Sequence, residues 1–84
     1  MKKITAEQLR ENYKRFACDS IRTLDIEYSL AKNQLEKVEI LGQMHTMFLI
    51  LSNWFGELFH SNDIEAILKK HQVNYEKLKM GEQL

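Results

Sequence analysis

Apolar residues recur along the first third of the chain at the three- and four-residue spacing of an amphipathic helix. Residues three and four apart lie on the same side of a helix, so they form one stripe. Just before it, Thr5 and Gln8 form a capping box, in which each side chain accepts a hydrogen bond from the other residue's backbone N–H. The pattern predicts a first helix over about residues 6–32, with this stripe: Leu9, Tyr13, Ala17, Ile21, Leu24, Tyr28 and Ala31.

The boundary between the first and second helices has two interpretations. Asn33 is followed three positions later by Glu36, which favours a turn at residues 32–34 and a second helix over about residues 34–60. Alternatively, because the stripe continues through Leu35 and Val38, one helix runs on to Gly42. We favour the first interpretation, since two helices of roughly 27 residues each match in length and fold back as an antiparallel hairpin.

Capping residues also mark the C-terminal part of the chain. Asn62 with Glu65, and then Asn74, predict short helices over about residues 63–70 and 74–80, and Gly81 is a stop signal. The chain is therefore expected to form one all-α domain over residues 1–84, a long antiparallel helical hairpin plus one or two short C-terminal helices.

The second helix contains the most apolar stretch, MFLILSNWFGELF at residues 47–59. No charged residue occurs from Ile40 to Gly56, and a helix apolar on most of its circumference belongs in a core or a membrane. A membrane span needs about 20 predominantly apolar residues. Polar residues interrupt the stretch too often for that, so we expect burial against protein: Gln43, His45, Thr46, Ser52, Asn53 and Glu57.

A chain of 84 residues is too short to cover this helix completely. We expect a second copy, giving a dimeric helical bundle, or a different partner protein to cover the rest. The expected function is a small non-enzymatic protein–protein interaction module, such as a regulator, adaptor, inhibitor or chaperone-like accessory factor. The expected interface consists of the large apolar side chains of this helix: Met44, Met47, Phe48, Leu51, Trp54, Phe55, Leu58 and Phe59.

The net charge and the cysteine content narrow the possible functions and cellular locations of the chain. Twelve basic and twelve acidic residues cancel, so the chain has no bulk attraction to nucleic acid. Lys3, Arg10 and Lys14 share one face of the first helix and would serve the alternative function, a nucleic-acid-binding regulator. Cys18 is the single cysteine, which favours a reducing, cytoplasmic location, and the basic first residues lack the apolar run of a secretory signal.

Few residues of the sequence suggest a catalytic or metal-binding site. Glu57 and His60 have the Glu-x-x-His spacing of di-iron bundles, and a metal-binding bundle enzyme is the second alternative. The pair ends the expected second helix, whereas such sites lie inside bundles, so we predict no metal site, cofactor, catalytic residue or small-molecule substrate. His45 could be a ligand, a pH-sensitive interface residue or a hydrogen-bonded core histidine, of which the third is commonest. His71 is expected at the surface.

Overall fold

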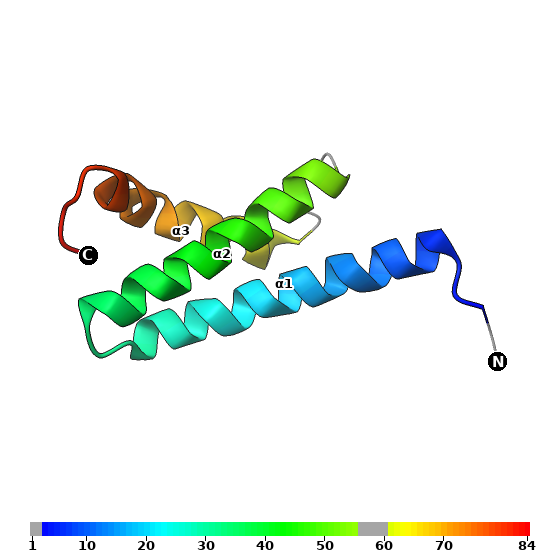
Figure 1. Cartoon of the computed structure of the whole chain (residues 1–84), viewed down its shortest axis with the longest axis horizontal. Coiled ribbons are helices and arrows are strands. Elements are labelled where there is room, and N and C mark those ends of the chain that lie inside the picture. The colour runs from blue at the N-terminus through cyan, green and yellow to red at the C-terminus, as the bar shows by residue number, and fades with distance from the viewer. Residues whose placement is uncertain (1–2, 56–60) are drawn as a thin grey trace.

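The computed structural model describes residues 3–55 and 61–84, which form three α-helices and no strand (Figure 1). The helices are α1 (Ala6–Leu30), α2 (Gln34–Phe55) and α3 (Asn62–Lys79). The all-α prediction is therefore confirmed. Residues 56–60, expected at the end of the second helix, lie outside the described part.

Side-chain caps set the first two helix starts as predicted. The Gln8 N–H donates to Thr5 Oγ1 at 3.1 Å, and the Thr5 N–H donates to Gln8 Oε1 at 3.0 Å. The Glu36 N–H donates to Asn33 Oδ1 at 2.9 Å, and Glu36 Oε2 accepts from the Lys32 N–H at 2.8 Å. The turn between α1 and α2 therefore lies before Gln34, and Gly42 lies inside α2.

The core lies where the three helices meet. α1 and α2 run side by side in opposite directions over most of their length, and α3 packs against one face of this pair (Figure 1). The middle of the stripe predicted for the first helix, Ala17, Ile21 and Leu24, supplies the α1 part of the core, whereas its first member, Leu9, is 55% exposed. α1 and α2 contribute residues at three- and four-residue spacing and α3 contributes Ile64, and the buried apolar set is Ala17, Ile21, Leu24, Leu41, Met44, Phe48, Leu51 and Ile64.

The C-terminal segment is one continuous helix, which corrects the expectation of two short helices over 63–70 and 74–80. The expected break at Asn74 does not form, because its side-chain amide lies 3.0 Å from His71 Nδ1 and does not cap a new helix. The stop at Gly81 is confirmed: its φ of +72° is left-handed, and the next N–H, of Glu82, donates to the Lys77 carbonyl at 2.8 Å.

The sequence predicts that the apolar stretch of α2 is buried against protein and does not span a membrane. Within residues 3–55 and 61–84, no helix combines the length and apolarity that a membrane crossing needs.

The core assignment predicts unequal costs for two leucines of α2. Leu51 has no exposed surface, whereas Leu35 is 68% exposed. Leu51→Ala leaves a cavity and should lower the free energy of unfolding by about 2–5 kcal/mol. Leu35→Ala should change it by less than about 0.5 kcal/mol. Urea unfolding followed by circular dichroism measures both values, and equal losses would contradict the assignment.

Candidate interaction surface

Polar contacts hold α3 against one side of α1. Arg22 Nε donates to Asp63 Oδ2 at 2.5 Å, and Asp25 Oδ1 lies 2.8 Å from both His71 Nε2 and Lys70 Nζ. Arg22 and Asp25 are three residues apart and share one side of α1. α3 therefore covers only the side of the helix pair that these residues face.

His71 is the buried histidine, which corrects its expected surface position. It is 1% exposed and its ring packs edge-on against Tyr28, with centroids 4.7 Å apart. The Asn74 amide donates to Nδ1, so the network assigns the proton to Nε2, which donates to Asp25. Both ring nitrogens are occupied within the protein, so His71 positions α3 and offers no nitrogen to a ligand.

His45 is exposed, so the core-histidine interpretation of this residue is wrong. Its ring lies 5.4 Å from that of Tyr75 on α3, and it lines a hollow between α2 and α3. His71, by contrast, continues the buried stripe of α3 at spacings of four and three from Ile64 through Leu68. That spacing was visible in the sequence and could have identified the core histidine.

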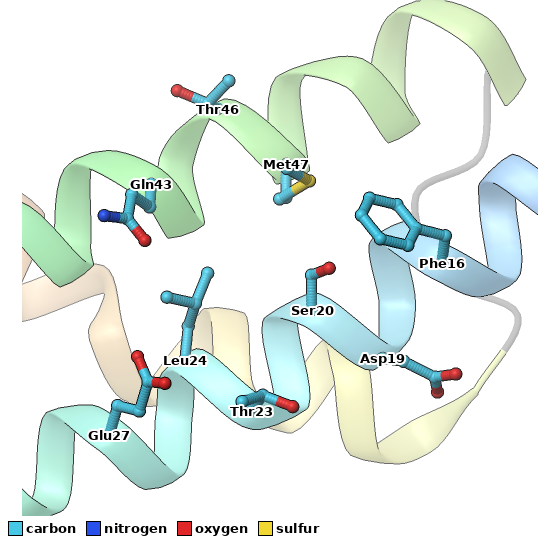
Figure 2. Close-up of a pocket in the computed structure, with 9 residues that line it drawn as sticks. All are labelled: Phe16, Asp19, Ser20, Thr23, Leu24, Glu27, Gln43, Thr46 and Met47. Atoms are coloured by element: carbon cyan, nitrogen blue, oxygen red, sulfur yellow. The ribbon is translucent and has the colours of Figure 1, made fainter.

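The side of the helix pair away from α3 carries an open groove (Figure 2). Its central part has a volume of about 520 Å³. Gln43 and Met47 of α2 and Ser20 and Leu24 of α1 form opposite walls in Figure 2. Glu27 and Gln43 also line a second hollow of about 310 Å³ nearer the α1–α2 turn, so the two hollows adjoin each other. We call this surface, from Leu9 to Leu30 on α1 and from Glu36 to Trp54 on α2, the α1/α2 groove.

The end of the groove near the start of α1 is aromatic. The Tyr13 ring lies 6.0 Å from Phe16 and 5.1 Å from Trp54 between centroids. Phe16 is 58% exposed, Trp54 52% and Leu9 55%. The Arg10 guanidinium donates to the Trp54 carbonyl and so links α1 to α2 at this end. At this end, large apolar side chains are exposed on two helices that the Arg10–Trp54 hydrogen bond holds together.

The other half of the groove is acidic. Its lining includes three carboxylates and, among the residues that the structure describes there, no lysine or arginine: Glu27, Glu36 and Glu39. A fourth carboxylate, that of Asp19, lies on the Phe16 side and points away from the space between α1 and α2 in Figure 2. Asp19 pairs with Arg22 at 2.7 Å, and Glu36 takes part in the α2 cap. Glu27 and Glu39 are exposed. The groove therefore changes from aromatic to acidic along its length.

The residues expected at the interface fall into three groups: some are buried in the core, some line the groove, and some lie outside the described part of the chain. Met44, Phe48 and Leu51 are buried in the core of the chain itself and have almost no surface to offer a partner. Met47 and Trp54 line the α1/α2 groove. The last three lie outside the part whose side chains are described: Phe55, Leu58 and Phe59.

Sequence reasoning missed the contribution of α1 to this surface. A second stripe on α1 follows alternating steps of four and three and runs beside the buried one. Its middle is small or polar, which made it look like an ordinary solvent-facing side of a helix. Its members are Leu9, Tyr13, Phe16, Ser20, Thr23, Glu27 and Leu30.

The three basic residues considered for nucleic acid do not form a separate outward face. Lys3 precedes α1 and is exposed, whereas Lys14 is half-buried. Arg10 and Lys14 continue the stripe of Ala17 and Ile21 toward the start of α1, and Arg10 bonds to α2. This placement gives the three residues no common outward face for a phosphate backbone.

The described residues also offer little for metal or thiol chemistry. No cluster of three or more histidine, cysteine, aspartate or glutamate side chains suited to a metal occurs in residues 3–55 and 61–84. Glu57 and His60 lie outside these ranges. Burial raises the pKa of the half-buried Cys18 thiol, which keeps it protonated and weakly nucleophilic.

Comparisons of the chain with known protein families, curated proteins and solved structures find no match. The function is therefore argued from the described surface. On that surface, one groove joins exposed aromatic side chains to a row of carboxylates.

The attachment of α3 predicts acid sensitivity. Burial raises the pKa of Asp25, but hydrogen bonds from Lys70 and His71 outweigh it, so the pKa lies below the usual 3.8. A depressed carboxyl pKa stabilises the fold above the unfolded value, and the gain is lost as pH falls through the folded value. The free energy of unfolding should therefore drop below about pH 4, and Asp25→Asn should reduce that slope.

Urea unfolding at pH 3 and pH 7 measures this difference. Part of the slope should remain in the variant, because the Arg22 hydrogen bond lowers the pKa of Asp63 as well. Identical pH dependence in the two proteins would show that Asp25 does not contribute.

For Tyr75, unlike Asp25, we predict that removal of the polar group does not lower the free energy of unfolding. Its hydroxyl is buried without a hydrogen-bond partner among the described residues, and burial raises its pKa to about 12. Because a buried hydroxyl without a partner is costly, Tyr75→Phe should leave the free energy of unfolding unchanged or raise it by up to about 1 kcal/mol. The variant should also lose less stability than wild type between pH 10 and 12. Thermal unfolding checks both, and a large loss at neutral pH would contradict the burial assignment.

Proposed function

We propose that this chain is a small, non-enzymatic protein–protein interaction module that packs a helical partner into the α1/α2 groove. The exposure of Leu9, Phe16 and Trp54, each above one half, carries the proposal. Contiguous exposed apolar side chains of this kind mark interaction sites, and aromatic residues are the usual anchors of interfaces.

The arrangement of the helices supports a helical partner. Two antiparallel helices with α3 on one face leave the opposite face open to further helices at the 8–10 Å spacing of helix packing. Met47 and Phe16, on opposite walls of the groove, would pack against the apolar side of such a helix, as in helix-in-groove recognition. Basic residues of the partner would lie along the acidic half.

The same charges weigh against the nucleic-acid alternative. A phosphate backbone in the groove would meet Glu27 and Glu39, whereas nucleic-acid-binding surfaces concentrate basic residues. The acidic lining therefore favours a protein partner.

Replacement of one groove residue tests the proposed function. Phe16→Glu places a charge in the aromatic end and should abolish retention of the partner, whether a second copy or another protein. Val73→Glu is the matched control, because Val73 is 53% exposed but lies on α3. The measurement is affinity capture from host extract together with light scattering, with circular dichroism confirming that both variants fold.

The proposal fails if wild type and Phe16→Glu retain the same proteins and have the same molar mass at every concentration.

A further inference from the structure

We propose that the partner in the α1/α2 groove is a second copy of this chain, related by a two-fold axis perpendicular to the helices, so that the two groove faces stack on each other with the chains running in opposite directions. This inference rests on the proposed function and names its partner. In this arrangement α1 faces the partner subunit's α1 and α2 faces its α2, each pair antiparallel. The axis crosses α1 near Ser20, the middle of the stripe from Leu9 to Leu30.

The exposed stripe of α1 is complementary to itself in this arrangement. The axis brings residues whose numbers sum to about 39 opposite one another. Leu9, 55% exposed, then faces Leu30 of the partner subunit, 71% exposed, so two apolar side chains cover each other. Phe16 faces the partner's Thr23, which places a large side chain over a small one, in the hollow that Ser20 and Thr23 line.

The distribution of charged residues along the chain also favours the antiparallel arrangement. Residues 3–15 carry Lys3, Arg10, Lys14 and Arg15 against two glutamates, whereas the groove lining near the turn is acidic. The proposed axis brings the basic start of one α1 to the acidic turn end of the partner subunit, where Glu27 lies on the facing α1 and Glu36 and Glu39 lie on the adjacent α2. A two-fold axis along the helices would instead stack the acidic halves on each other. Like charges facing across an interface disfavour an arrangement, so the antiparallel one is selected.

The face is large enough for a dimer. α1 has 25 residues and is therefore about 37 Å long at 1.5 Å per residue. Two adjacent helices of about 10 Å diameter give a face of roughly 700 Å² per chain. A stable protein–protein interface buries about 800 Å² per partner, so the groove face alone comes close to that size.

Cross-linking between mixed chains tests the orientation. Cys18→Ser removes the native thiol, and Leu9→Cys and Leu30→Cys are then made in separate chains. A short bifunctional maleimide should link a mixture of the two chains in high yield and neither chain with itself. This pattern is specific to the antiparallel dimer, because the other two-fold axis keeps these positions at opposite ends.

A charge exchange gives an independent readout. Arg10→Glu and Glu27→Lys should each weaken dimerisation about tenfold, and an equimolar mixture should restore it by forming the heterodimer. Glu76→Lys, on the exposed side of α3, is the matched control and should not change the dimer. Sedimentation equilibrium measures the association, and circular dichroism confirms folding.

The outcomes separate this inference from the proposed function. Linked mixed chains and restored heterodimer support it. A dimer whose Leu9→Cys and Leu30→Cys chains do not link overturns the orientation. A monomer that retains another protein in a Phe16-dependent manner overturns the second copy as partner but leaves the proposed function. A monomer with no Phe16-dependent partner overturns both.

Discussion

Burial of the seam between α1 and α2 is the interaction on which the rest of the structure depends. Ile21, Met44 and Leu51 have no exposed surface, and full burial of such a side chain contributes about 1.5–3 kcal/mol. A helix can turn only part of its circumference toward one neighbour. The seam therefore leaves two outer faces along the pair, and α3, with 18 residues, covers one of them. The other outer face stays open because the described part of the chain has no further helix to cover it.

The polar contacts of α3 determine which face stays open. Asp25 accepts from His71 and contacts Lys70, and Arg22 binds Asp63. Buried polar groups need partners in fixed directions, so the His71 network sets the position of α3 on α1 more strictly than apolar contacts alone would. The α1/α2 groove keeps its shape because α3 is tied to the opposite side.

Local signals in the sequence predicted the first two helix starts, whereas the expected Asn62 cap of α3 is replaced by Ser61, which makes no side-chain cap hydrogen bond. The packing partners of individual side chains needed the structure. Thr5 and Asn33 were identified because a cap depends on residues three positions away. Asn74 has the same local signal, but its amide binds His71 within a continuous helix. On α2, Leu41, Met44, Phe48 and Leu51 form one apolar stripe, and Ile40, Met44, Met47 and Leu51 form a second that overlaps it. Periodicity alone could not show which of the two faces its own chain. The groove side of α1 was missed because its middle is polar.

The most direct test of the open face is the fluorescence of Trp54, the single tryptophan of the chain, which lies at the aromatic end of the groove. Acrylamide quenching is measured over a wide range of protein concentrations. If the face is covered by a second copy, the indole is shielded at high concentration, and both quenching and emission wavelength increase on dilution. Quenching that is the same at every concentration, at the level of a half-exposed indole, would contradict the account.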